Sequence, residues 1–161
     1  MPKAPVVSPM TVREILDDKP VTGRRLMTLT PSSPVSEAVT MMVRENISSV
    51  LVLEGSKLAG ILTLRELLYG LEKLGAKLLD ARAGDVMNAA PARVAPDDSA
   101  DRLRAIMTEK HVTHVPVLEG EELVGVISFH DIARSAVKEA AFENKLLKQY
   151  IKNWPASEKS T

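Results

Sequence analysis

The sequence predicts an α+β fold built from two copies of one folding unit, followed by a C-terminal helix. Residues Leu26–Leu68 recur without a gap as Pro91–Ala133, at a constant shift of 65 positions (26 to 91). In each copy, apolar residues appear first at helical spacing and then in two short runs separated by a turn, which predicts the order helix, strand, strand, helix. Since a unit of about 60 residues is marginal when alone, we expect the copies to pack together about a pseudo-twofold axis.

The first helix of each copy is predicted from a capping residue followed by a regular apolar stripe. In the first copy, Ser33 is the expected N-cap and Pro34 takes the first helical position, where its missing N–H has no consequence. In the second copy, Asp98 is the expected N-cap. The stripes comprise Val35, Ala38, Val39 and Met42 in the first copy and Ala100, Leu103, Ile106 and Met107 in the second.

A β-hairpin is predicted after each of these helices. Val50–Leu53 and Leu58–Leu62 are short apolar runs on either side of the polar turn Glu54–Lys57. Val115–Leu118 and Leu123–Ile127 repeat this arrangement in the second copy. Each pair of runs therefore predicts two antiparallel strands joined by a short turn.

Thr63 and Ser128 stand where a second helix begins in each copy, because a hydroxyl side chain favours the N-cap position. After Thr63, four leucines at helical spacing predict a buried stripe: Leu64, Leu67, Leu68 and Leu71. A short helical segment also leads into each copy, at Val12–Leu16 and Ala83–Met87. We therefore predict a flexible N-terminus at 1–10, repeats at 11–75 and 76–138, and a C-terminal helix and tail at 139–161.

The tail is predicted to be an amphipathic helix. From Ala136 onward, apolar residues follow helical spacing while lysines occupy other faces. The apolar stripe consists of Ala140, Leu147, Tyr150, Ile151 and Trp154, and it includes the only tryptophan of the chain. Two alternatives remain open: this helix contacts a partner or a second copy, or it packs back over its own module.

Composition and charge exclude several classes of protein. The chain has 161 residues, of which 45% are hydrophobic, enough to form a buried core. Its 21 Lys and Arg balance 21 Asp and Glu, so no overall positive field recruits nucleic acid or an anionic membrane. The absence of cysteine removes disulfides, thiol catalysis and thiolate metal sites. We find no export signal and no run of about 18 apolar residues, and we therefore expect a cytoplasmic protein.

Two local patterns mark the repeat. A small polar pair precedes an apolar strand in both copies, as Ser48-Ser49 and as Thr113-His114. The signature Gly-x-x-Ser/Thr-x-x-Asp is complete at Gly125–Asp131, whereas at Gly60–Glu66 a Glu replaces the final Asp. With the order of elements, these patterns resemble a tandem pair of CBS domains, the module named after cystathionine beta-synthase, over Thr11–Lys138.

The resemblance implies a stand-alone regulatory module that binds an adenosine-containing ligand, AMP, ADP or ATP, between the copies and signals to an effector protein. It also implies which residues face the ligand. One nucleotide site would comprise Ser128, His130 and Asp131 from the second copy and Thr22, Met27, Ser48 and Ser49 from the first. A possible second, mirror site would comprise Thr63, Arg65, Glu66, Ala92, Thr113 and His114.

Residue chemistry agrees with these implied roles. A helix N-terminus led by Ser128 offers N–H groups, a hydroxyl donor and a favourable dipole to a phosphate. Asp131, one turn later, can accept hydrogen bonds from both ribose hydroxyls. Arg65 and His130, each just before the acidic residue of its signature, can bring positive charge to the phosphate.

Several alternatives compete with this interpretation. The Thr63 and Glu66 pair and the Ser128 and Asp131 pair also have the spacing of capping boxes, which need no ligand. The ribose contact would equally suit S-adenosylmethionine or NAD, and a module without ligand could act as a scaffold through its C-terminal helix. His111-x-x-His114 has the form of a metal pair, but no carboxylate lies at a helpful spacing, so we expect no metal.

We predict that the protein is not an enzyme and uses no catalytic cofactor. The sequence places no nucleophile beside a base, and its three histidines lack an acidic partner at catalytic spacing. The expected partners are the adenosyl ligand, an unidentified effector protein and a second copy in a homodimer. No contact with nucleic acid or membrane is expected.

Overall fold

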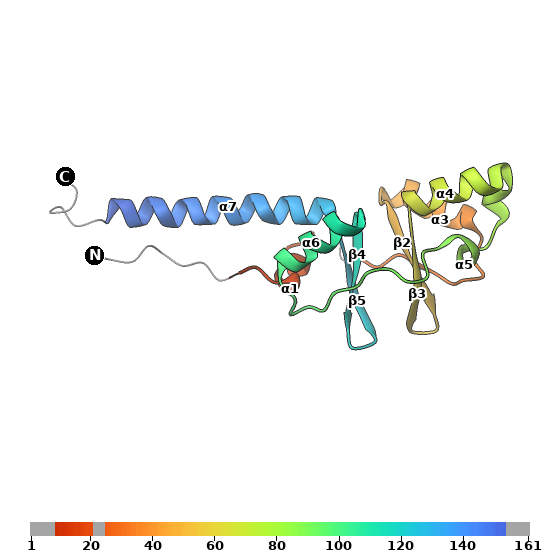
Figure 1. Ribbon diagram of the computed structural model, residues 1–161, viewed down its shortest axis with the longest axis horizontal. Coiled ribbons are helices and arrows are strands. Elements are labelled where there is room, and N and C mark those ends of the chain that lie inside the picture. The colour runs from red at the N-terminus through yellow and green to blue at the C-terminus, as the bar shows by residue number, and fades with distance from the viewer. Residues whose placement is uncertain (1–8, 21–24, 154–161) are drawn as a thin grey trace.

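The fold follows the predicted order of elements, with the two copies side by side and one long helix projecting from them (Figure 1). The computed structural model describes residues 9–20 and 25–153. The first copy contains β1 (Thr28–Leu29), α3 (Val35–Glu45), β2 (Ser49–Glu54), β3 (Lys57–Thr63) and α4 (Leu64–Leu74). The second contains α6 (Ala100–Lys110), β4 (His114–Glu119), β5 (Glu122–Ser128) and α7 (Phe129–Lys152). Both predicted hairpins and the helices around them are confirmed.

The two hairpins have the same register. β2 and β3 are antiparallel with Ser49 opposite Thr63, and β4 and β5 are antiparallel with His114 opposite Ser128. In each hairpin, the second residue of the predicted polar pair therefore lies beside the residue that opens the following helix. The duplication thus places equivalent polar groups at equivalent corners of the two copies.

A third strand joins the first hairpin only. β1 runs parallel to β2 with Leu29 opposite Val52, which gives a three-stranded sheet. In the second copy, the equivalent residues Val94 and Val117 form a single parallel bridge. The edge strand therefore occupies the same position in both copies, but in the second copy it is reduced to a single β-bridge.

The first helix of each copy begins one residue later than predicted. Pro34 is the N-cap of α3 rather than its first residue, and Ser99 caps α6 in place of Asp98. Both predicted caps are used in the preceding turn instead: Ser33 accepts a hydrogen bond from the backbone N–H of Thr30, and Asp98 accepts one in the equivalent turn. The capping prediction was therefore wrong because the side chains close a turn before the helix starts.

The two leading segments form helices, and each packs on the copy that it does not lead into. They are α1 (Val12–Asp17) and α5 (Ala83–Val86). Val12 and Ile15 are fully buried in the core of the second copy. Ala83 is fully buried in the core of the first. Each leading segment therefore precedes one copy in the sequence but packs in the core of the other, and this exchange holds the two copies together.

Equivalent glycines give these crossing segments room. A Cβ on Gly60 would lie 2.6 Å from the backbone oxygen of Asn88 and 2.6 Å from Sδ of Met87, just after α5. A Cβ on Gly125 would lie 2.7 Å from Cδ2 of Leu16 in α1. The glycine of each signature is thus explained by close packing, because a larger side chain would displace the crossing segment.

α4 exposes most of the stripe that was predicted to be buried. Three of its four leucines are between 53% and 65% exposed: Leu64, Leu68 and Leu71. Leu67 packs against the core of the first copy, and Gly70 is buried against Leu78 of the 3-10 helix η1 (Gly75–Asp80). The predicted period was right, but the apolar face of α4 points away from the core of its own chain.

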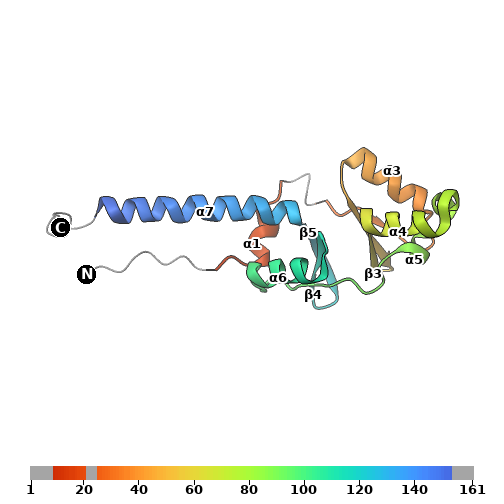
Figure 2. The ribbon, with the colours of Figure 1, turned by 45° about the horizontal axis from the view of Figure 1, so that its top comes forward.

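α7 continues well beyond both copies in both views (Figures 1 and 2). Its apolar residues past the module are exposed, including Val137 at 70% and Ile151 at 65%. Glu139, at the start of the tail, still pairs with Arg104 of α6 over 3.2 Å. The apolar residues of the described helix beyond it are not covered by the module, and Trp154 lies outside the described residues. None of the described helices combines the length and apolarity needed to cross a bilayer.

Candidate functional site

A cleft of about 1180 Å³ opens between the two copies. All described residues of both predicted sites line it: Met27, Ser48, Ser49, Ser128, His130 and Asp131 of the first, and Thr63, Arg65, Glu66, Ala92, Thr113 and His114 of the second. Thr22 of the first site lies outside the described residues. The two residue sets therefore share one continuous cleft, whose volume exceeds the range of about 300–1,000 Å³ usual for one small-molecule pocket.

Ser128 and Asp131 form a reciprocal pair at the start of α7. The Asp131 backbone N–H donates to Ser128 Oγ over 3.1 Å, and the Ser128 backbone N–H donates to Asp131 Oδ2 over 2.9 Å. This is a capping box, as one of the alternatives expected. The box brings the hydroxyl and the carboxylate together at a helix N-terminus on the wall of the cleft.

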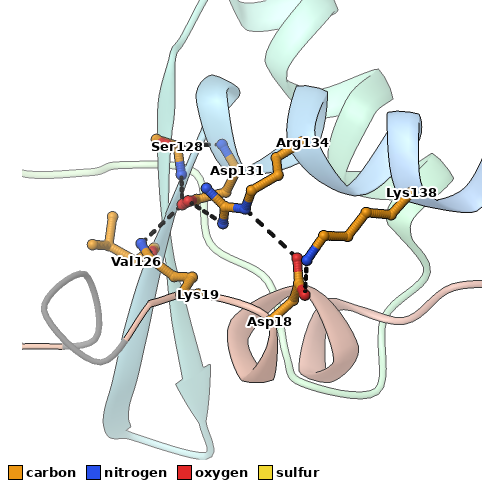
Figure 3. A network of polar contacts seen from close by, with 7 residues as sticks. All are labelled: Asp18, Lys19, Val126, Ser128, Asp131, Arg134 and Lys138. Atoms are coloured by element: carbon orange, nitrogen blue, oxygen red, sulfur yellow. Dashed lines mark hydrogen bonds and ion pairs between the residues drawn. The ribbon is translucent and has the colours of Figure 1, made fainter.

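Two cations hold the Asp131 carboxylate (Figure 3). Lys19 Nζ lies 2.8 Å from Oδ2, and an Arg134 terminal nitrogen lies 3.0 Å from Oδ1. Lys19 also donates to the carbonyl oxygen of Val126 over 2.8 Å. The side chains of Lys19 and Asp131 are only 10% and 6% exposed, so this ion pair is largely shielded from water.

The electrostatics keep Asp131 ionised. Burial by itself would raise its pKa, but the hydrogen bonds from Lys19, the Ser128 backbone and Arg134 outweigh it, and the pKa lies below the ordinary 3.8. A second carboxylate, Asp18, extends the network: Lys138 Nζ lies 2.6 Å from Oδ1, and Arg134 Nε lies 3.6 Å from Oδ2 (Figure 3). The hydrogen bond from Lys138 is the main cause that lowers the pKa of Asp18.

Thr63 and Glu66 repeat the box at the start of α4. The Thr63 backbone N–H donates to Glu66 Oε2 over 2.8 Å, and the Thr63 hydroxyl also donates to that oxygen. The backbone N–H of Arg65 donates to Thr63 Oγ1 over 3.2 Å. The longer Glu side chain therefore accepts from the hydroxyl of its own N-cap residue, whereas the Ser128 hydroxyl accepts from the Asp131 backbone N–H.

Arg65 points across the cleft to the second copy. Its guanidinium donates to the carbonyl oxygen of His111 over 3.0 Å, at the C-terminal end of α6. The same group donates to the Tyr69 hydroxyl over 3.0 Å and lies over the Tyr69 ring. Arg65 thus caps a helix C-terminus, where positive charge is favourable, and spans the two halves of the site.

A hydrogen bond between Ser48 and His114 also connects the two copies. Ser48 Oγ lies 3.0 Å from Nε2 of His114, and Nδ1 of the same ring lies 2.9 Å from Thr113 Oγ1. Burial and the nearby Lys19 ammonium lower the pKa of His114 to about 4, so the ring is neutral at pH 7. This geometry corrects the prediction that no nucleophile lies beside a base.

The histidines do not gather into a metal centre within the described chain. His111 ends α6 in a left-handed conformation with φ of 54°, and both ring nitrogens of His114 are hydrogen-bonded to hydroxyls. In residues 9–20 and 25–153, no group of three or more His, Asp or Glu side chains is placed to hold an ion. The His-x-x-His spacing is therefore explained by a helix end and a cross-copy hydrogen bond.

Sequence reasoning missed two important cations of the cleft. Lys19 follows α1, which ends at Asp17, and lies outside the ungapped repeat, so the duplication gave no signal for it. Arg134 follows Asp131 by three positions on α7, a spacing that brings opposite charges together on a helix and was visible in the sequence. Both residues add positive charge beside the carboxylate that was predicted to bind ribose.

The cleft combines three kinds of surface. Helix N-termini and cations suit an anionic group, and two carboxylates can accept from hydroxyl groups. Apolar side chains line the walls between them: Met27, Leu51, Ile61, Val112 and Val126. The arrangement therefore suits a ligand with a flat apolar part, neighbouring hydroxyls and a phosphate or similar anion.

Comparison with known proteins supports the architecture. The family model of the CBS domain matches residues 12–73 and 83–138. A solved protein with CBS domains from Burkholderia ambifaria is 34% identical, with a TM-score of 0.75, and the match covers 80% of this chain and 95% of that protein's chain. The mitochondrial CBS domain-containing protein CBSX3 of Arabidopsis thaliana is 29% identical over 76% of this chain.

The curated relatives are longer than this chain. The matched region spans 62% of CBSX3 and 35% of an arabinose 5-phosphate isomerase from Yersinia pestis, which is 28% identical over 117 residues. Two solved structures at 21% identity share the fold and contain ligands. One is CBSX2 in complex with AMP, with a TM-score of 0.67. The match covers 81% of this chain and 98% of the CBSX2 chain. The other is a CBS domain pair in complex with 5′-methylthioadenosine and S-adenosyl-L-methionine, with a TM-score of 0.70. That match covers 82% of this chain and 99% of the domain pair.

Proposed function

This chain belongs to the CBS-domain family, and from that premise we propose that it is a non-catalytic regulatory module that binds an adenine nucleotide, AMP, ADP or ATP, between its two CBS domains. One observation carries the proposal: hydroxyl, carboxylate and apolar groups from both copies converge on one cleft. The relatives solved with AMP and with S-adenosyl-L-methionine and 5′-methylthioadenosine support an adenosine-containing ligand.

In the proposed complex, the phosphate lies at the N-terminus of α7 and the ribose lies at Asp131. Ser128 faces the anion at the positive end of the α7 dipole, with His130 beside it. The base extends toward Met27, Ser48 and Ser49 on the opposite wall. Thr22 is proposed to complete this side of the site.

Ribose binding must rearrange the contacts of Asp131. A carboxylate has about four acceptor positions, and here the two oxygens already interact with Ser128, Lys19 and Arg134. Two ribose hydroxyls therefore have to displace at least one of these partners. Lys19 is the partner that comes from outside β5 and α7, in the segment just after α1, so its release would transmit occupancy of the cleft to the segment that follows the N-terminal helix.

The mirror site is proposed to be weaker. Glu66 accepts from both the backbone N–H and the hydroxyl of Thr63, and Arg65 is engaged with the end of α6. The Thr63 hydroxyl proton is therefore already donated to Glu66, whereas Ser128 Oγ accepts from the Asp131 backbone N–H and keeps its own proton for a phosphate. We therefore expect one tight site and one weak site per chain, with Ala92, Thr113 and His114 facing the weak one.

The Ser48 and His114 contact does not favour catalysis. A histidine with a pKa of about 4 is a weak base at neutral pH. Its second nitrogen contacts a hydroxyl of Thr113, whereas catalytic histidines are usually oriented by a carboxylate. The pair is better explained as a link between the two copies on the wall of a binding site.

Titration calorimetry with AMP, ATP, S-adenosylmethionine and NAD tests the proposal. We expect an adenine nucleotide to bind with a stoichiometry dominated by one site, and competition with AMP will show whether the other compounds share the cleft. A ligand that binds only the folded state should add about 2.7 kcal/mol of stability at 100 times its Kd. Absence of both heat and thermal stabilisation with all four compounds would contradict the proposal.

We also propose that the module forms a homodimer. The exposed leucines of α4 lie on one helical face, at spacings of four and three residues: Leu64, Leu68 and Leu71. An apolar stripe of this kind is typical of a surface that another chain covers.

A further inference from the structure

The part of α7 beyond the module carries a heptad pattern. Its residues at alternating spacings of three and four are Val137, Ala140, Asn144, Leu147 and Ile151. All five are exposed, although four of them are apolar. α7 is continuous from Phe129 to Lys152 and projects away from both copies (Figure 1). An exposed seam with this spacing is the pattern by which two helices pack as a coiled coil.

One seam position identifies the kind of coiled coil. If Val137, Asn144 and Ile151 occupy the first heptad position, called a, then Ala140 and Leu147 occupy the fourth, called d. A single Asn among apolar a residues specifies register and oligomeric state in parallel dimers, because the two amides can pair with each other. Asn144 thus favours a second copy of the same helix as partner.

The charges beside the seam complement a second copy. Glu143 takes the seventh heptad position and Lys148 takes the fifth position of the next heptad, five residues later. In a parallel dimer these positions from opposite chains lie next to each other and form interhelical ion pairs. Within the described ranges of the chain, neither residue makes an ion pair of its own, so both are available.

We propose that α7, from Val137 to its end, forms a parallel two-stranded coiled coil with α7 of a second copy. This rests on the dimer part of the proposed function and is independent of ligand binding. The segment has two heptads, too few for a stable isolated coil, so it acts together with the attached modules. Because Ser128 and Asp131 lie at the other end of the same helix, the coil would connect the nucleotide site to the dimer axis.

Disulfide crosslinking of the full chain tests this directly, because the protein has no native cysteine. Ile151→Cys and Asn144→Cys place thiols on the seam, where the parallel arrangement brings equivalent residues within disulfide reach. Gln149→Cys and Phe142→Cys are matched controls on the outer face of the same helix. We expect both seam variants to form crosslinked dimers at least tenfold faster than their controls. Equal rates in the two classes would overturn the proposal.

A second measurement separates the coil from nucleotide binding. Leu147→Glu places charge on the seam, whereas Phe142→Glu alters a comparably exposed apolar residue off it. By analytical ultracentrifugation, we expect Leu147→Glu to raise the dimer dissociation constant at least tenfold and Phe142→Glu to leave it unchanged. The reverse order would contradict the coil. Since neither residue lines the cleft, AMP titration of the two variants reports on the proposed function separately.

Discussion

Ser48 of the first copy and His114 of the second lie 3.0 Å apart, Oγ to Nε2, and this hydrogen bond joins the two CBS domains across their common cleft. Ser48 lies just before β2, and His114 is the first residue of β4. The contact is shielded enough from water to keep His114 neutral. Protonation of the ring would therefore act on the interface between the copies and on the ligand site together.

Stability is predicted to fall as the pH drops below 6.5, because of His114. The folded-state pKa is about 4, below the ordinary 6.5, so the unfolded chain takes up the proton first. Urea unfolding should show a loss of about 1 to 2 kcal/mol between pH 7 and pH 5. The variant His114→Gln should lose this part of the slope, whereas His111→Gln should keep it. An unchanged slope in His114→Gln would contradict the assignment.

The buried ion pair of Lys19 and Asp131 is predicted to matter more than a surface pair. Lys19→Met should lower the free energy of unfolding by about 3 kcal/mol, the lower end of the range for breaking a buried pair, because Arg134 still contacts Asp131. Lys57 pairs with Glu121 at the surface, where the side chains are 73% and 82% exposed. Lys57→Met should change stability by less than about 1 kcal/mol. Equal losses in chemical denaturation would show that Lys19 is not buried in this way.

The two signature glycines are predicted to differ in their tolerance of alanine. In Gly60→Ala the new methyl meets the backbone oxygen of Asn88, which two hydrogen bonds with Ile61 hold in place. In Gly125→Ala it meets the end of the Leu16 side chain, which can rotate away. Thermal and urea unfolding should show a loss of about 1 to 3 kcal/mol for Gly60→Ala and a smaller one for Gly125→Ala. A larger loss for Gly125→Ala would contradict the inference that the Leu16 side chain yields more easily than the Asn88 backbone.

The strength of the mirror site is tested by Glu66→Gln. The substitution keeps the size of the side chain but removes the charge at the Thr63 corner. If the tight site is at Asp131, the main binding event for AMP should change by less than about threefold, equivalent to less than 0.7 kcal/mol. A tenfold loss of affinity in calorimetry would assign the tight site to the first CBS domain instead.

Much of the fold could be predicted because the duplication repeats local patterns. The hairpins follow from apolar runs around short turns, and they were placed correctly in both copies. The caps of α3 and α6 were misplaced by one residue, since Ser33 and Asp98 can close a turn as readily as cap a helix. Local chemistry alone does not decide between these uses.

Long-range packing could not be predicted from the pattern. The sequence shows that α4 has an apolar face, but not that this face points outward, because periodicity reports a stripe and not what covers it. The crossing of α1 to the second copy was missed for a similar reason. Lys19 reaches Asp131 only because of that crossing. No pattern in the sequence therefore indicates that Lys19 pairs with the Asp131 carboxylate.

The central claim is that Asp131 binds the ribose of an adenine nucleotide, and AMP titration of Asp131→Asn against wild type tests it most directly. Asp97→Asn is the control, since the Asp97 side chain is 92% exposed and lies away from the cleft. We expect wild type and Asp97→Asn to bind AMP equally, and Asp131→Asn to bind about 1.5 to 3 kcal/mol more weakly, a loss of tenfold or more. Equal affinity for AMP in all three proteins, with Asp131→Asn folded, would contradict the account.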